Sequence, residues 1–267
     1  MTPAWLDEVE PATSPPFVRM GTRGLRGQPW LLGGDDVPAQ LAERRWILAE
    51  HHDDVVAALP GSDEAIAELS ALVASEGWGS GAGSLRVLGT LVAEDLCLLV
   101  DGVLVAGVLC FPSHWRFRDK LGLPLAAVHG PVPDYGADLQ EKVDRFLGKL
   151  RPGLANAVWR RNWTVHHEPD LFAPVVPPPP DPPVTAADAA DRLWFRSERQ
   201  TLTRLPRTGA VVFTIRTQQV PLGTLADRPE LGRKLRAAMA AWPAQQVAYR
   251  GGEELRRPLL SWFDAVS

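Results

Sequence analysis

Two apolar runs separated by Asp101-Gly102 form the clearest pattern of hydrophobic and polar positions in the chain. The runs cover residues 96–100 and 103–111, and the dipeptide between them accepts the positive φ angles of a type I′ turn. The pattern therefore predicts a β-hairpin. Further along, prolines restrict the backbone around His129 in the sequence His-Gly-Pro-Val-Pro. A rigid loop that carries one imidazole beside an apolar hairpin is typical of a buried metal cofactor site.

Helical periodicity and strand alternation predict the remaining elements. Helices are expected over residues 36–59, 62–75, 138–150 and 228–267, and strands over 157–166, 193–205 and 210–219. The proline-rich tract 174–183 cannot join a sheet. A hairpin, helices and then three strands predict an α+β fold, a PAS-like curved antiparallel sheet with helices on one face and with N- and C-terminal helical extensions.

The order of the predicted elements along the chain indicates three regions that form one compact unit. Residues 1–85 would be an N-terminal wrap with helices, residues 86–222 the PAS-like core that binds a cofactor, and residues 223–267 the C-terminal helical extension. At 267 residues with 45% hydrophobic positions, the chain is long enough to bury a full core.

A dense polar run, Glu198-Arg199-Gln200, lies inside the second predicted strand. Alternation puts Arg199 on one face of that strand and Glu198 on the other. Arg199 could pair with a cofactor carboxylate, and Glu198 could serve as an acid, a base or an amine-binding anion. The alternative is an exposed sheet face held by ion pairs, and the sequence leaves both interpretations open.

Four histidines are candidates for a site on this sheet. His129 has the best case as a metal ligand, although a core histidine held by hydrogen bonds fits the same pattern. His114, just past the hairpin, fits a hydrogen-bonding role better than ligation. His166 and His167 end a strand, so alternation points only one of them inward.

A glycine-rich loop, residues 20–27, carries Arg23 and Arg26 and follows Arg19. Backbone amides and guanidinium groups could together hold a carboxylate or a phosphate, but a solvated loop is the alternative. The sequence contains no nucleophile elbow, P-loop, dinucleotide fingerprint or zinc-spaced cysteine set, so the common hydrolytic and nucleotide-binding motifs are missing.

Charge and composition limit the classes of binding partner that we expect. A net charge of −4 and a pI near 5.9 do not favour nucleic acid or an anionic membrane as the main partner. We find no signal-peptide pattern and no membrane-length apolar run, and we expect a cytoplasmic protein. The turn register places Cys97 opposite Ala106 and Cys110 opposite Ala93, which is too far out of register for a disulfide. Both should be free thiols.

Several longer motifs then point to one family. They are Cys110-Phe-Pro-Ser-His-Trp115, Lys120-Leu-Gly, His129-Gly-Pro-Val-Pro-Asp-Tyr135, Arg161-Asn-Trp-Thr, Glu198-Arg-Gln-Thr-Leu, Leu205-Pro and Phe213-Thr-Ile-Arg-Thr217. From residue 17 to residue 222, the chain resembles the haem-binding subunit of the haem-dependent oxidative N-demethylases, which are related to dimethylamine monooxygenases. The N-terminal glycine-rich loop and the run His166-His167-Glu168 depart from the family pattern and bear on substrate identity.

The resemblance implies a PAS-like domain that binds haem b through a histidine and activates O2 at the iron. A small methylated amine would be hydroxylated on its N-methyl carbon, and the resulting carbinolamine would collapse to the demethylated amine and formaldehyde. NADPH, FMN and a [2Fe-2S] centre on partner subunits or domains would supply the electrons. Substrate identity, the reductase, the oligomeric state and the sixth iron ligand stay open.

By the same resemblance, His129 is the iron ligand. Arg199 and Arg216 are candidates for pairing with the haem propionates or for the distal pocket, and Arg19 and Trp163 for further cofactor contacts. Glu198 and Asn162 are the candidate catalytic residues. Two alternatives from other functional classes are a PAS-like haem sensor without turnover and a small-ligand-binding protein that has lost haem, in which His129 is a core residue.

Overall fold

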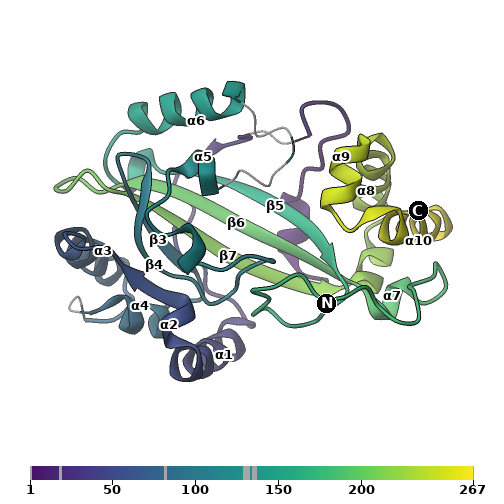
Figure 1. Ribbon diagram of the computed structural model, residues 1–267, viewed down its shortest axis with the longest axis horizontal. Coiled ribbons are helices and arrows are strands. Elements are labelled where there is room, and N and C mark those ends of the chain that lie inside the picture. Colours follow the sequence, from purple (N-terminus) through teal and green to yellow (C-terminus); the bar gives the residue numbers. More distant parts are fainter. Residues whose placement is uncertain (1, 18–19, 81–82, 129–132, 134–136, 267) are drawn as a thin grey trace.

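A single seven-stranded antiparallel sheet forms the centre of the protein in a computed structural model that describes residues 2–17, 20–80, 83–128, 133 and 137–266 (Figure 1). The strand order is β1-β5-β6-β7-β3-β4-β2. The strands are β1 (Arg23–Gly24), β2 (Val56–Ala58), β3 (Asp95–Val100), β4 (Val103–Val108), β5 (Val158–His166), β6 (Trp194–Arg204) and β7 (Val211–Pro221). The predicted α+β class is confirmed, and β1 and β2 extend the five predicted strands at the two edges.

The hairpin is the one that the sequence predicts. Asp101 and Gly102 have φ angles of 50° and 77°, and Val100 pairs with Val103. A β-bulge then shifts the register, so that Cys97 faces Gly107 and not Ala106. Both cysteines are buried free thiols, as expected.

Helices cover parts of both faces of the sheet, which corrects the expectation of helices on one face. Five of the six residues of β3 are buried, so both of its faces need apolar cover. On one face, Leu96, Leu98 and Val108 belong to a core cluster with residues of α1 (Val37–Glu50), α3 (Asp63–Ser75) and α4 (Leu85–Leu91). We call this the α1 face.

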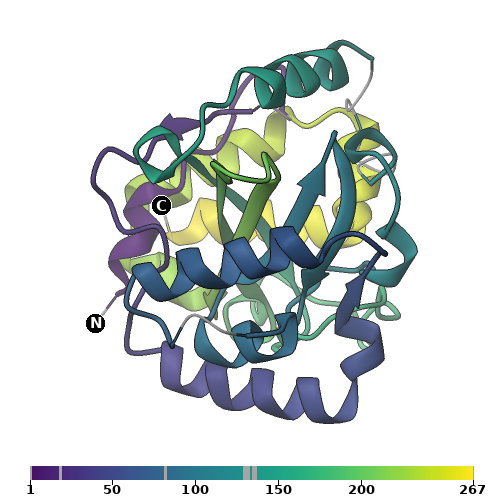
Figure 2. The same cartoon turned by 90° about the vertical axis from the view of Figure 1, so that its left-hand side faces the viewer.

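The opposite face carries Cys97, Leu99 and Ile215, which cluster with residues of α5 (Leu125–Val128) and α6 (Ala137–Lys149). We call it the α6 face. Figure 2 shows α6 and α1 on opposite sides of the strands. The two faces of the sheet therefore have separate surroundings.

The helix predicted over 36–59 is interrupted. It ends at Glu50, restarts as the short α2 (His52–Val55) and gives way to the edge strand β2. The pairing of Val56 with Val108 explains the change, because the open edge of β4 accepts a β-branched segment. The other predicted helices and strands are observed within a few residues of their expected ends, while α4 was not predicted.

The C-terminal region is helical, as expected, and packs at one end of the sheet. It comprises α8 (Pro229–Ala241), α9 (Ala244–Tyr249) and α10 (Gly252–Val266). With α7 (Ala189–Arg192) and the 3-10 turns Ala4–Glu8 and Leu222–Asp227, these helices bury Phe195, Leu235 and Phe263 in a second core. Two shorter 3-10 turns cover Arg118–Lys120 and Leu154–Asn156. Within the described ranges, no helix combines the length and apolar character that crossing a membrane requires.

Candidate functional site

The centre of the α6 face is polar. Glu198 in β6 lies opposite Asn162 in β5 and Thr217 in β7, so all three share this face. Glu198 and Asn162 are half-buried. The Glu198 carboxylate accepts a hydrogen bond of 3.0 Å from Nε2 of Gln200. The hydroxyl of Thr217 is buried and has no hydrogen-bond partner among the described residues.

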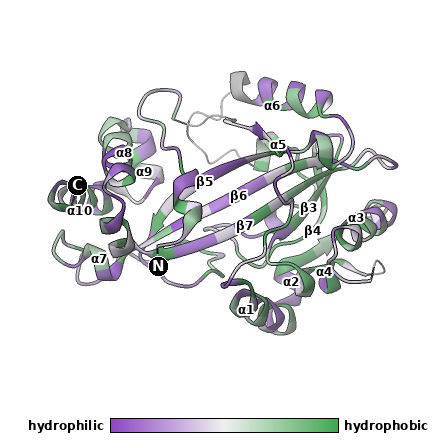
Figure 3. Cartoon of the chain, turned by 180° about the vertical axis from the view of Figure 1, so that it is seen from behind, coloured by the Kyte–Doolittle hydropathy of each residue, from purple (hydrophilic) through white to green (hydrophobic). Residues whose placement is uncertain are grey.

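Beside this polar centre, the same face becomes apolar towards α5 and α6. Leu202 and Phe213 are directly paired across β6 and β7 and are only half-buried. Leu125 of α5 packs in the same cluster. In Figure 3, β3 and β4 are coloured hydrophobic, whereas much of β5 and β6 is hydrophilic. The α6 face therefore combines an apolar area with carboxylate and amide groups.

His129 lies outside the described residues, as does Arg19. The chain on either side of His129 is held at two described points. The backbone N–H of Leu125 donates to the carbonyl of Gly102 at 2.9 Å, and the carbonyl of Pro133 accepts a hydrogen bond from Nε2 of Gln246 in α9 at 3.2 Å. Val128, the residue directly before His129, is the last residue of α5.

The α1 face carries a row of three buried arginines at the same register. Arg199 in β6 lies between Arg161 in β5 and Arg216 in β7. Burial lowers the pKa values of Arg199 and Arg161, so their charge must be stabilised by nearby acceptors and aromatic rings.

Each of the three arginines has protein partners. Arg199 donates to the carbonyls of Trp30 and Pro29 at 3.1 and 2.9 Å and lies 5.2 Å from the centre of the Trp159 ring. Arg161 donates twice to Glu8, at 3.0 and 2.6 Å. Arg216 pairs with Asp36 at 2.8 Å and also donates to Gln40.

Trp163 belongs to the α1 face as well. Its ring stacks on Phe195 and Trp242, with centroid distances of 6.0 and 5.6 Å, and Arg250 lies over it at 5.3 Å. The structure therefore brings Glu198 and Asn162 together, and it places Arg199, Arg216 and Trp163 on the other side of the sheet. A cofactor bound over Glu198 could not reach that second set.

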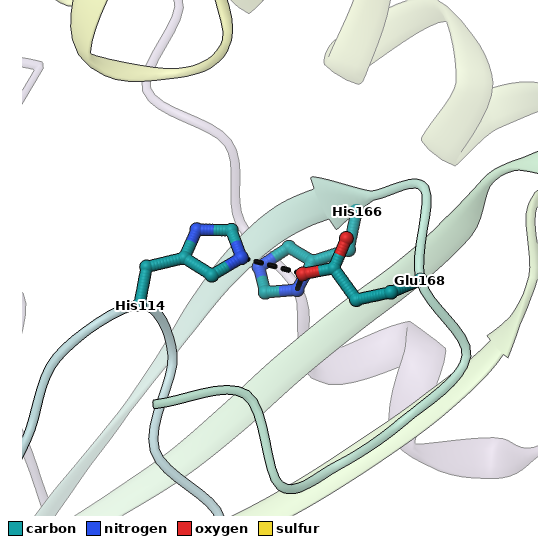
Figure 4. A group of neighbouring side chains, drawn as sticks. All are labelled: His114, His166 and Glu168. Carbon is teal, nitrogen blue, oxygen red and sulfur yellow. Dashed lines mark hydrogen bonds and ion pairs between the residues drawn. The ribbon is translucent and has the colours of Figure 1, made fainter. Parts of the chain in front are cut away.

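A third group of polar residues lies at the end of β5. His166, the last residue of β5, is on the same side of the strand as Asn162 and is 3% exposed. His114 follows β4, and Glu168 follows β5. The ligand atoms of these three side chains all lie within 4.8 Å of one another (Figure 4).

The contacts in this group are close. Nε2 of His114 lies 2.5 Å from Oε1 of Glu168, and Nδ1 of His166 lies 3.2 Å from the same oxygen. Burial lowers the pKa of His166 despite the nearby carboxylate, which favours its neutral form. Burial alone would raise the pKa of Glu168, but its contacts with His114 and His166 outweigh burial and hold that pKa well below its usual value.

Sequence reasoning found part of this group. Alternation correctly predicts that one of His166 and His167 points inward, and His166 is the buried one. The proximity of His114 to that strand end was not predicted, because it depends on the loop after β4. A parallel bridge between Ser113 and Ala173 brings this loop to the segment after β5, and no local pattern encodes that pairing.

The fold and its sites describe an α+β protein in which one sheet face combines polar and apolar groups, together with a histidine–carboxylate cluster. Residues 73–260, about 70% of the chain, match the family described as haem-dependent oxidative N-demethylase, alpha subunit-like. The chain belongs to this family, as its sequence motifs suggested. The family's description implies a haem-dependent enzyme that removes methyl groups from nitrogen by oxidation, and an alpha subunit implies a partner subunit.

Proposed function

We propose that this chain is the haem-binding subunit of a monooxygenase that demethylates a small methylated amine, with haem b bound over the α6 face. The observation that carries the proposal is the polar centre of that face, Glu198 with Asn162, beside the half-buried Leu202 and Phe213. The donor set fits haem, because a porphyrin needs a broad apolar contact, and substrate and propionates need polar groups nearby. A PAS-like assignment of the sheet is supported by the strand order, in which β3 lies between β4 and β7.

In this proposal His129 ligates the iron. It follows directly after α5, whose Leu125 packs on the α6 face, and an imidazole is a common axial ligand of haem. Bound haem would supply the activation of O2, which side chains cannot perform. This chain's own residues would bind and orient the amine.

Glu198 is the proposed anion for the substrate. A small methylated amine is protonated at neutral pH, and a half-buried carboxylate binds an ammonium group by a charge-assisted hydrogen bond. Glu198 would also accept the ammonium proton, so that the amine nitrogen becomes neutral before oxidation. Asn162, directly opposite in β5, would orient the substrate. Arg160 lies on the same face, opposite Gln200, and is the propionate partner that we propose for this side of the sheet.

Electrons would come from NADPH through FMN and a [2Fe-2S] centre on partner subunits or domains. The family's description as an alpha subunit supports such a division of labour. The products would be the demethylated amine and formaldehyde.

Visible spectroscopy tests the haem part of this proposal. The purified chain, produced with added haem, should show a Soret band that survives gel filtration. His129→Ala should lose it, whereas His52→Ala, a change at an exposed histidine of α2, should keep it. A wild-type chain without a Soret band contradicts the haem proposal, and a band retained by His129→Ala contradicts only the ligand assignment.

Turnover tests the reaction. With dimethylamine, NADPH and a flavin/[2Fe-2S] reductase, the holoprotein should release formaldehyde. A stable haem complex that gives no formaldehyde with any methylated amine would instead favour a haem sensor without turnover. A folded chain that binds small amines but no haem would favour a small-ligand-binding protein.

A further inference from the structure

The cluster of His114, His166 and Glu168 has the composition of a metal site. Two imidazoles and one carboxylate converge from two parts of the chain, the loop after β4 and the end of β5, and the three ligand atoms lie within 4.8 Å of one another. Ligands of a tetrahedral zinc ion, at about 2.0–2.1 Å from the metal, are roughly 3.3 Å apart. The 3.2 Å separation of Nδ1 of His166 and Oε1 of Glu168 already has this value, and His114 would need to move outward from its 2.5 Å contact with the same oxygen.

Two buried polar atoms of this cluster have no hydrogen-bond partner among the described residues. Nδ1 of His166 is buried and lacks a hydrogen bond of acceptable geometry, although Oε1 of Glu168 is near it. Oε2 of Glu168 is buried without a hydrogen-bond partner as well. Buried polar atoms without partners cost free energy in a folded protein. A bound cation would give Nδ1 of His166 a partner.

The surroundings also orient the ligands. Nε2 of His166 lies 3.2 Å from Oγ of Ser113, which leaves Nδ1 as the nitrogen that faces Glu168. Metal-bound histidines commonly use their other ring nitrogen for such a hydrogen bond. His114 adopts a φ angle of 61°, which is uncommon for a residue other than glycine and clusters at functional sites. Its backbone N–H is fixed by the carbonyl of Ala173 at 2.7 Å.

We propose that His114, His166 and Glu168 bind one divalent transition-metal ion through Nε2, Nδ1 and the carboxylate. Mixed nitrogen and oxygen ligands favour ions such as Zn²⁺ over Mg²⁺ and Ca²⁺, which prefer oxygen ligands alone. Three protein ligands leave a fourth position for a solvent molecule. The site is independent of the proposed haem ligand, His129, and would join the loop after β4 to the end of β5.

Metal analysis of the purified chain, with or without haem, tests this proposal. The protein is treated with EDTA, incubated with ZnCl2, passed through a desalting column and analysed for zinc by mass spectrometry. We expect about one zinc per chain in the wild type. His114→Gln and Glu168→Gln should each retain at least about tenfold less. Zinc should also raise the melting temperature of the wild type by about 5 °C, and that of neither variant.

His167→Gln is the matched control. His167 is the next residue after His166, its side chain is 26% exposed like that of His114, and its Nδ1 lies 3.6 Å from the other oxygen of Glu168, yet it is not among the three proposed ligands. The His167→Gln variant should retain as much zinc per chain as the wild type. Circular dichroism and gel filtration establish that each variant is folded, and His114, at 27% side-chain exposure, is the ligand least needed for packing.

Three outcomes would overturn the proposal. The first is a wild type that retains no zinc after desalting. The second is equal zinc in Glu168→Gln and wild type, which would assign the ion to exposed groups such as His51 and Asp54. The third is loss of zinc in His167→Gln with full retention in His114→Gln. None of these readouts depends on haem or on turnover, so they stand apart from a failure of the demethylase proposal.

Discussion

Two sets of polar residues, one on each face of the sheet, have opposite surroundings. On the α1 face, Arg161, Arg199 and Arg216 are buried, and each is engaged by acceptors from the N-terminal segment or α1. On the α6 face, Glu198 and Asn162 are half-buried and interact mainly with neighbours on their own strands. Both sets look alike in the sequence, as polar residues inside strands.

The comparison shows how a structural charge differs from a functional one. A buried charge without partners would be expensive, so a charge that supports the fold is satisfied by the protein itself. A charge that binds a ligand keeps part of its hydrogen-bonding capacity free and part of its surface accessible. By this criterion the arginine row of the α1 face is structural, and Glu198 is the better candidate for substrate binding.

The largest effect is expected beneath α1, where Arg44 and Asp95 form an ion pair of 2.6 Å with both side chains fully buried. Asp95 also accepts hydrogen bonds from the backbone N–H groups of Cys110 and Phe111. Asp95→Ala leaves all these donors unpaired and should lower the free energy of unfolding by about 3–5 kcal/mol. Urea denaturation followed by circular dichroism measures it. Asp53→Ala, a change at an exposed carboxylate, is the control. If both variants lose the same free energy of unfolding, the buried charges of the α1 face do not support the fold.

A smaller and more selective effect is expected from the adjacent residues Arg199 and Glu198. Arg199→Met leaves the carbonyls of Pro29 and Trp30 without a hydrogen-bond donor. It should lower the free energy of unfolding by about 2 kcal/mol. Glu198→Gln preserves shape, and should change stability by no more than about 0.5 kcal/mol. Its kcat/KM for the amine should fall by roughly 30-fold, which corresponds to about 2 kcal/mol for one charge-assisted hydrogen bond.

Measuring both quantities in both variants sharpens the comparison of the faces. We expect stability and activity to separate: haem content and folding are retained in Glu198→Gln while turnover drops. If Glu198→Gln unfolds as readily as Arg199→Met, or keeps full activity, then Glu198 is structural as well, and the distinction between the two faces fails.

Much of the fold was predictable because its signals are local. The Asp101-Gly102 turn, the alternation in β6 and β7, and the periodicity of α6 each depend on residues close in sequence. What could not be predicted depends on distant partners. The strand β2 exists because β4 offers it an edge, and helices cover both sides of the sheet because β3 is buried on both sides.

The candidate site divides in the same way. Alternation alone separated Glu198 from Arg199 and indicated that only one of the two histidines at the end of β5 points inward. It could not show that Arg199 would meet the carbonyls of Pro29 and Trp30, some 170 positions away in the chain, or that His114 would meet Glu168. Such contacts arise from the packing of loops, for which a single sequence carries no periodic signal.

The smallest effect concerns the two thiols, one in each of the apolar clusters on the two faces of the sheet. Cys97 packs with the α6 face and Cys110 with the cluster beneath α1. Burial raises the pKa of both thiols, that of Cys110 to about 12, so neither should react with a disulfide reagent at pH 8 unless the protein opens.

The variants Cys97→Ala and Cys110→Ala each leave one thiol whose reaction rate can be measured. In the haem-free protein we expect Cys97 to react faster, because the proposed haem site lies on its face and that side should open locally at lower cost. Haem should slow the reaction of Cys97 and leave that of Cys110 unchanged. If Cys110 reacts faster than Cys97 in the haem-free protein, the region that opens more readily lies on the α1 face.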